Sequence, residues 1–160
     1  MFVKPHSTLA ERAALMADFW EHLVEDVVKD MRDRIYRCYI EAVTLAVGQL
    51  TALSKAGRLD LELFARSCEG ALMGSKANAL RVLGVLRDGL GAVEGSDLEP
   101  LLGVALSFPS AQVQRAALGL ARDNVTASLL TRESVAAIVR LADLDPLVVP
   151  EAREFVLRAS

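Results

Sequence analysis

The 160-residue sequence contains few of the residues that build β-sheets, and this scarcity restricts its fold class. It has three isoleucines and two tyrosines, whereas leucine occurs 26 times and alanine 24 times. Leucine and alanine are strong helix formers, while strands favour β-branched and aromatic residues. The 17 valines are the one β-leaning exception. Hydrophobic residues make up 52% of the chain, which excludes an intrinsically disordered protein. From the excess of leucine and alanine we expect an all-α fold.

The sequence also lacks an excess of positive charge and a long apolar run. With 18 basic and 21 acidic residues the net charge is −3, so nucleic acid is not an expected partner. Residues 42–54 are uncharged, but this stretch of 13 residues is shorter than the roughly 20 that cross a bilayer. No positively charged start followed by an apolar core is present. We therefore expect a cytoplasmic protein without a membrane partner.

Cysteine is rare, which limits redox and metal chemistry. Cys38 and Cys68 lie within apolar helical patterns and are 30 residues apart, far from a metal or redox spacing. Cysteine is among the residue types that are most often buried. The sequence therefore predicts two buried free thiols in a reducing compartment.

Histidine is equally scarce, and only one of the two histidines has an informative neighbourhood. His6 is near the terminus, whereas His22 has Asp18 and Asp26 one helical turn to either side and Glu25 three residues on. Such a carboxylate-rich face is able to ligate a divalent metal in principle. We interpret it as a solvated acidic face. A metal-dependent helical enzyme using Asp18, His22 and Asp26 is the less favoured alternative.

The first third of the chain has neither proline nor glycine between Ser7 and Val47. Thr8 and Glu11 have the spacing of a capping box, which marks a helix start. Apolar residues then recur every three or four positions, at Leu9, Ala13, Met16, Trp20, Leu23, Val27, Met31 and Ile35. We expect a long N-terminal helix or helical hairpin, with a bend or break in the charged run at residues 29–34.

Residues 35–55 have only one narrow polar stripe at helical spacing. The stripe consists of Arg37, Glu41, Thr44, Gly48, Thr51 and Lys55. A helix that is polar along a single stripe is usually wrapped by neighbours on its other sides. We therefore expect this stretch to be the central helix of the N-terminal part, ending at Gly57.

Beyond Gly57 the chain divides into shorter helical units. Capping residues precede most of the apolar segments, at Asp60, Ser75, Ser96 with Glu99 as a capping box, Ser110 and Thr131. We expect Pro100 to fall in the first turn of its helix, and Pro150 to open a last helix. The sequence predicts seven or eight helices in a single all-α domain over residues 1–160, with a long-helix region at 1–57 and helical hairpins at 58–160.

An internal repeat is visible in the second region. The segment Ala71–Asp88 aligns with Ala105–Asp123, with identities that include Ala77 and Arg81 at an offset of 34 and Gly84 at 35. A period of this size is typical of helical hairpins that bury their apolar faces by stacking.

The repeated residues resemble a known family. Residues 98–120 form an apolar segment that ends at a turn containing Pro109, and Val113-x-x-Ala116-Ala117 then starts a second helix, as in a HEAT repeat. A shortened second candidate spans residues 138–155, and the resemblance covers about residues 60–160. Gly74-Ser75 replaces the proline turn, and residues 1–55 do not fit. The resemblance implies an α-solenoid scaffold for protein contacts, with no catalytic residue and no cofactor.

Three large side chains in the N-terminal region are candidate partner contacts. Phe19 and Trp20 are adjacent, so on a helix they point about 100° apart and do not face the same core. Trp20 is then an exposed anchor for a partner, or alternatively it lies in the core with Phe19 at the edge. Met31 lies inside the charged run at residues 29–34, and it too is either an exposed partner contact or a core residue.

No nucleophile elbow, phosphate-binding glycine loop or zinc-ligand spacing occurs in the sequence. We therefore expect a non-enzymatic adaptor or assembly subunit, which presents a helical surface to a protein partner or to another copy of itself as a dimer. The alternative is a different class of function, in which the protein is a helical-bundle sensor or carrier that binds a small apolar ligand between its helices.

Overall fold

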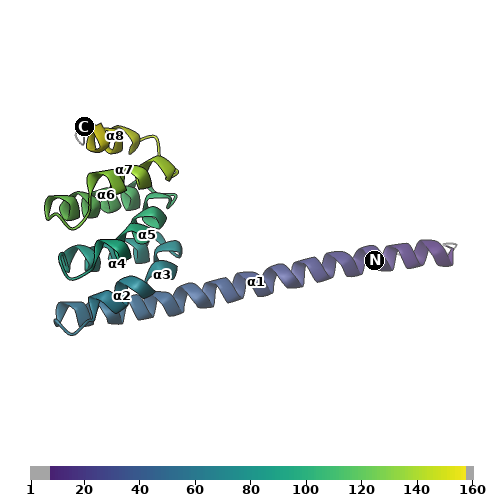
Figure 1. Cartoon of the computed structure of the whole chain (residues 1–160). Helices are drawn as coiled ribbons and strands as arrows, with labels where there is room; N and C mark the ends of the chain where they lie inside the picture. Colours follow the sequence, from purple (N-terminus) through teal and green to yellow (C-terminus); the bar gives the residue numbers. More distant parts are fainter. Residues whose placement is uncertain (1–7, 158–160) are drawn as a thin grey trace. The chain divides into compact units, whose positions relative to one another are not determined.

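The computed structural model describes residues 8–157, including every side chain in this range except that of Trp20. These residues form eight helices and no strand, which confirms the all-α class and the expected number of helices (Figure 1). The helices are α1 (Leu9–Lys55), α2 (Leu61–Ser67), α3 (Glu69–Met73), α4 (Lys76–Asp88), α5 (Gly95–Leu106), α6 (Ala111–Thr126), α7 (Arg132–Leu141) and α8 (Val149–Leu157).

Helix α1 begins and ends at the residues that the sequence indicates. The N–H of Glu11 donates to the Thr8 hydroxyl at 3.2 Å, and the N–H of Thr8 donates to the Glu11 carboxylate at 2.8 Å, so the capping box is confirmed. At the other end Gly57 has a φ of 66°, and the N–H of Arg58 donates to the carbonyl of Leu53 at 2.9 Å. This is a Schellman motif, whose left-handed residue favours glycine.

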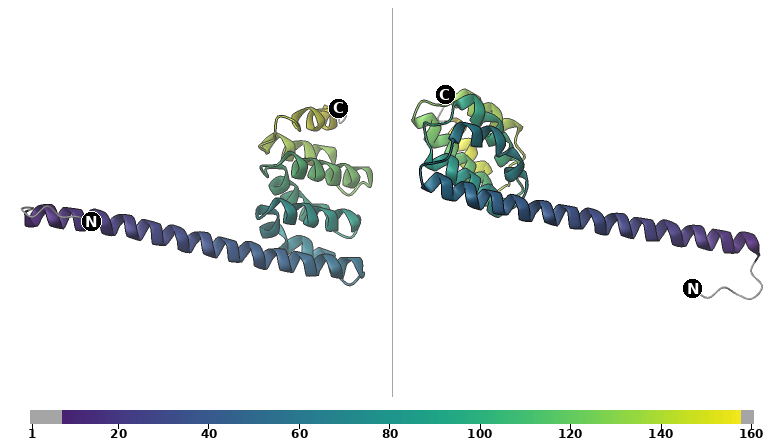
Figure 2. Two further views of the ribbon diagram at one scale, coloured as in Figure 1. Left: turned by 180° about the vertical axis from the view of Figure 1, so that it is seen from behind. Right: turned by 90° about the horizontal axis from the view of Figure 1, so that it is seen from below.

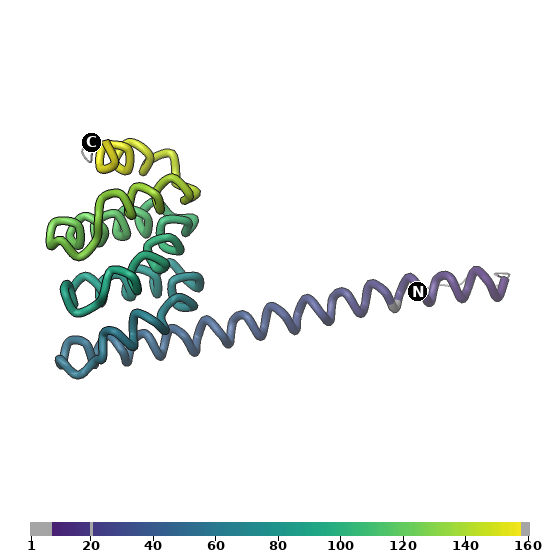
Figure 3. The backbone as a smooth tube through the Cα atoms, in the orientation of Figure 1, coloured from purple at the N-terminus to yellow at the C-terminus, as the bar shows by residue number. Residues whose placement is uncertain are grey.

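The break expected at residues 29–34 is absent, because α1 runs without interruption through them (Figure 3). Alternating charges stabilise this run locally, since Arg34 and Asp30 form an ion pair of 2.8 Å one helical turn apart. Of the two alternatives predicted for this region, the single long helix is confirmed and the helical hairpin is wrong.

Internal contacts divide the chain into two compact units, Met1–Glu41 and Ala42–Ser160. The boundary lies inside α1, whereas the sequence suggested a division at residues 57 and 58. The first unit contains α1 from Leu9 to Glu41. The second contains about the last four turns of α1, residues 42–55, together with α2–α8. A single domain over residues 1–160 stays a prediction.

Within the second unit, helices contact both their neighbours in sequence and the next helix but one. Helix α3 packs on α4, α5 on α6 and α7 on α8. In addition, α5 contacts α3 on one side and α7 on the other. Helix α4 packs on α6 in the same way (Figure 2). Each of the inner helices is thus held on more than one side.

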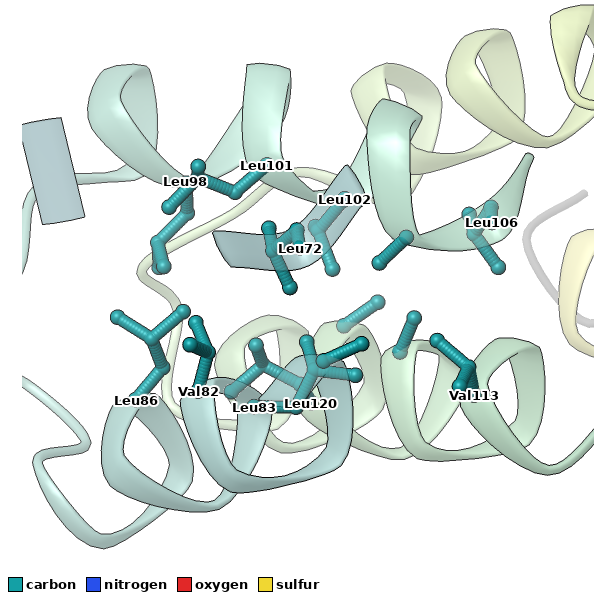
Figure 4. Packing of buried hydrophobic residues seen from close by; sticks show 14 of the residues in the cluster. Leu72, Val82, Leu83, Leu86, Leu98, Leu101, Leu102, Leu106, Val113 and Leu120 are labelled. Carbon is teal, nitrogen blue, oxygen red and sulfur yellow. The ribbon is translucent and has the colours of Figure 1, made fainter. Parts of the chain in front are cut away.

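Leucine and valine side chains fill the space between these helices. Leu72 of α3 and Leu102 of α5 lie on one side of the core, and Val82 of α4 and Leu120 of α6 lie on the other (Figure 4). All four side chains are almost completely buried. Burying a leucine or valine side chain contributes about 1.5–3 kcal/mol, so this shared core is the main source of stability in the second unit.

Most of the predicted caps hold the shorter helices. The side chains of Asp60, Ser75 and Thr131 each accept a hydrogen bond of 3.0 to 3.1 Å from the N–H three residues on. The capping box predicted at Ser96 is wrong. The carbonyl of Glu94 accepts from Asp97 and Leu98, so α5 starts earlier and Pro100 lies in its second turn.

The predicted burial of the second half of α1 is also wrong. Within residues 42–55 only Val47 is fully buried, with Val43 and Leu50 partly buried beside it, and these residues occupy one face of the helix. Leu45 and Leu53 are exposed. This stretch is therefore packed along one face instead of being wrapped by neighbours.

Candidate protein-interaction surface

The first unit carries an unusual amount of exposed apolar surface. Every side chain that the structure describes between Leu9 and Tyr39 is exposed. Twelve large hydrophobic side chains are among them: Leu9, Leu15, Met16, Phe19, Leu23, Val24, Val27, Val28, Met31, Ile35, Tyr36 and Tyr39. Single exposed hydrophobic residues are common on proteins, but extended groups of them mark sites of interaction.

Many of these side chains share one face of the helix. We call this face the N-terminal apolar stripe. It consists of Leu9, Ala13, Met16, Leu23, Val24, Val27, Met31 and Ile35, which follow one another at steps of one, three or four, apart from a step of seven between Met16 and Leu23. Trp20 occupies a position in the same register. Charged residues such as Glu25 and Lys29 occupy the opposite face. Most of the segment is therefore amphipathic, although Leu15 and Tyr36 lie on the side of the charged residues.

The structure places two of the three predicted contact residues on the surface. Phe19 is 46% exposed and Met31 is 56% exposed. The side chain of Trp20 lies outside what the structure describes, and so does His6. Met31 belongs to the stripe, whereas Phe19 is about 100° from position 20 and lies at its edge.

Several further stripe residues were missed as contact candidates from the sequence. Leu23, Val27 and Ile35 follow the same spacing as Met31, but this spacing alone also describes a helix that faces its own core. The distinguishing observation is their exposure, which depends on the rest of the fold.

The acidic face around His22 holds one local contact. The His22 ring donates from Nδ1 to the carbonyl oxygen of Asp18 at 2.8 Å, and Nδ1 lies 3.5 Å from the Asp18 carboxylate. This hydrogen bond raises the pKa of His22 above 6.5, and the charges of Asp18, Glu25 and Asp26 add to the effect. Among the described residues, no group of three or more His, Cys, Asp or Glu side chains is arranged to hold a metal ion. Asp26 does not complete a metal site with Asp18 and His22.

One cleft of the second unit does not have the lining of an apolar ligand pocket. A cleft of about 380 Å³ between α6, α7 and α8 is lined by Arg122, Arg132, Glu151 and Glu154 as well as Phe155. Small apolar ligands need mostly hydrophobic and aromatic walls. This cleft therefore gives no support to the sensor or carrier alternative.

The two thiols have different environments, and both are free. Cys68 is buried as predicted, and burial raises the pKa of its thiol to about 11. The prediction for Cys38 is wrong, because Cys38 is exposed. It lies three residues after Ile35, so its position continues the N-terminal apolar stripe.

None of the helices in residues 8–157 is long and apolar enough to cross a lipid bilayer. Comparisons with protein-family models, curated proteins and solved structures find no match to the chain. Function is therefore inferred from the residues of this chain alone.

Proposed function

We propose that this protein is a non-enzymatic interaction subunit, which binds another protein chain along the N-terminal apolar stripe. The observation that carries the proposal is the exposure of Met16, Leu23, Val27, Met31 and Ile35 on one face of a helix. Amphipathic helices bind partners by laying such a face, with anchors at three- and four-residue steps, against an apolar surface.

The energetics of the helix support a bound partner. Most helical stability in proteins comes from packing of an amphipathic face, and an isolated helix is marginal in water. Val24, Val27, Val28 and Ile35 are β-branched and lower the intrinsic helix propensity. Because these side chains are exposed, the residues that the structure describes do not supply the packing that offsets this cost. A partner on the stripe stabilises the helix by burying them.

We further infer that residues 60–160 are a HEAT-like array. In support, three ion pairs connect residues at similar sequence separations, which are Arg66 with Asp97 at 3.1 Å, Arg87 with Asp123 at 2.9 Å and Arg115 with Glu151 at 2.8 Å. The separations are 31, 36 and 36 residues, about the length of one helical repeat.

The contacts between α3, α5 and α7, and between α4 and α6, agree with this inference. In an array of this kind each repeat packs only on its neighbours, so the array is a stiff support with a large surface. Arrays of this architecture bind proteins by shape and need no catalytic group.

Site-specific photo-crosslinking in cells tests the proposed function. A benzoylphenylalanine replaces Val27 on the stripe in one variant of the full chain, and Lys29 on the opposite face in a matched control. We expect a discrete covalent adduct with a protein from position 27 and none from position 29. No adduct from position 27, or equal adducts from both positions, would contradict the proposal.

A further inference from the structure

The charges beside the N-terminal apolar stripe are divided between the two halves of the segment. From Leu9 to Asp26 there are five acidic residues and one basic residue, whereas from Val27 to Arg37 there are four basic residues and two acidic ones. The acidic residues of the first half are Glu11, Asp18, Glu21, Glu25 and Asp26, and the basic residues of the second half are Lys29, Arg32, Arg34 and Arg37. One end of this helix is therefore negative and the next part is positive.

This division determines how two such helices attract each other. A parallel pair places the five carboxylates of one copy beside the same five of the other, and like charges repel. An antiparallel pair places the acidic half of each copy beside the basic half of the other. In the antiparallel pair the two-fold axis is perpendicular to the helices, so a single sequence supplies both complementary surfaces.

We propose that the partner on the N-terminal apolar stripe is a second copy of this chain, paired antiparallel over residues 9–41. The inference rests on the proposed function and specifies its occupant. The feature that assigns it is the combination of an exposed apolar stripe with charges that complement each other only when one helix runs opposite to the other.

The spacing of the stripe gives the pairing a defined register. When Leu23 lies opposite Val27 of the second copy, Met16 lies beside Ile35 of the second copy and Ala13 beside its Cys38. In this register every one of these positions faces an apolar residue or a thiol, as in the core layers of a coiled coil. Glu21 then lies beside Arg32 of the second copy at the edge of the core.

The same charges disfavour a lipid surface. Amphipathic helices that lie on membranes carry lysine and arginine on the polar face, which anionic headgroups attract. Here the polar face of the first half carries Asp18, Glu21 and Glu25, so anionic lipid repels it.

Disulfide trapping of the full chain tests both the pairing and its direction. Cys38 is an exposed thiol at a position that continues the stripe, whereas Cys68 is buried, so we expect only Cys38 to react in the folded chain. The variant Ala13→Cys, which keeps Cys38, places two thiols opposite each other in the antiparallel register. We expect mild oxidation to convert it to a covalent dimer, visible on a non-reducing gel and reversed by a reductant.

Two matched chains provide the controls. Besides the buried Cys68, the unmodified chain has Cys38, and the double variant Ala13→Cys with Cys38→Ser has a cysteine at position 13. In the antiparallel pair, identical positions 13 lie about 37 Å apart, at 1.5 Å per residue, which is far beyond disulfide reach. We therefore expect little cross-linking of either control. Efficient cross-linking of either control at low protein concentration shows a parallel pair and overturns the proposed direction.

A charge exchange gives a second readout that needs no cysteine chemistry. Glu21→Lys is expected to weaken the dimer about three- to tenfold, because it places a lysine beside Arg32 of the second copy in two symmetric places. Adding Arg32→Glu in the same chain restores the opposite charges and is expected to recover the original affinity. No recovery contradicts this register.

The outcomes separate this inference from the proposed function. A chain that forms no dimer in any variant, but gives an adduct with a different protein from position 27 in cells, overturns self-pairing and leaves the interaction subunit standing. A chain that forms no dimer and gives no adduct from position 27 overturns both the self-pairing and the proposed function.

Discussion

The side-chain amide of Asn78 donates a hydrogen bond of 3.0 Å to the hydroxyl oxygen of Thr44, which joins α4 to the C-terminal part of α1. Asn78 is completely buried, and its Oδ1 atom has no hydrogen-bond partner in the structure. A buried polar group with an unmet bond costs stability. This contact therefore fixes the position of α4 on residues 42–55 at an energetic cost.

Replacing Asn78 alone is expected to lower the stability of the fold, whereas replacing Asn78 and Thr44 together is not. Asn78→Ala removes the amide and leaves a cavity and should lower the free energy of unfolding by about 1–3 kcal/mol. The double variant Thr44→Val with Asn78→Leu replaces both partners by apolar groups and should unfold close to the original chain. Urea unfolding followed by circular dichroism measures both. A double variant no more stable than Asn78→Ala would contradict the account.

Two glycine substitutions are expected to have opposite effects. A Cβ atom at Gly95 would lie 2.5 Å from the carbonyl oxygen of Leu129, so Gly95→Ala should destabilise the fold by about 1–3 kcal/mol. Gly84 is in the interior of α4 with nothing within 4 Å of a Cβ atom. Gly84→Ala should therefore stabilise by about 0.5–1 kcal/mol. Thermal unfolding of the two variants compares them directly, and equal shifts would contradict the packing at Gly95.

The two thiols should react at very different rates. An aromatic disulfide reagent at neutral pH is expected to modify Cys38 rapidly and Cys68 only when the protein unfolds, because burial raises the pKa of the Cys68 thiol to about 11. This raised pKa also makes stability pH-dependent. The protonated Cys68 thiol contributes its full stability below pH 9, the ordinary pKa of a thiol. This contribution is lost as the pH rises toward 11. Rapid reaction of two thiols in the folded chain would contradict the buried position.

The pKa of His22 should lie above 6.5, since its ring is hydrogen-bonded to the Asp18 carbonyl and lies near carboxylates. A raised pKa stabilises the protonated form in the helix. This contribution is complete below pH 6.5 and is lost as pH rises through the folded-state pKa. Titration followed by NMR measures the value, with His6→Gln to assign the signal. Asp18→Asn is expected to lower the pKa of His22 toward 6.5, and no change would contradict the contribution of the carboxylate.

The ends of several helices could be predicted because their causes are local. Thr8 with Glu11, Asp60, Ser75 and Thr131 each cap a helix within three residues, and these bonds form wherever the adjacent residues are helical. A sequence pattern therefore contains all the information that such a cap requires.

The buried face of α1 could not be predicted from polarity. Thr44 and Thr51 belong to the polar stripe of the sequence, yet both are half-buried in the structure. Threonine tolerates this position because its hydroxyl finds partners, as when Thr51 donates to the Val47 carbonyl at 2.7 Å. Polarity by itself does not distinguish a solvated threonine from one that is hydrogen-bonded beside a core.

Gln114 illustrates a contact that depends on tertiary structure. Its side chain is buried, donates to the carbonyls of Phe108 and Asp143 at 2.9 and 3.0 Å, and accepts from the Asp145 N–H at 2.8 Å. The bonds to Asp143 and Asp145 join residues 29 and 31 positions apart, and no local pattern indicates them. The exposure of the N-terminal apolar stripe is of the same kind, since its spacing also fits a buried helix.

Sedimentation equilibrium of the full chain tests most directly whether the N-terminal apolar stripe joins two copies. The stripe variant is Leu23→Gln with Val27→Gln, and its matched control on the opposite face is His22→Gln with Lys29→Gln. The account predicts twice the 17.3 kDa chain mass for the unmodified chain and the control, and a single chain mass for the stripe variant. An unmodified chain that sediments as a monomer at all concentrations, or a stripe variant that remains a dimer, would contradict it.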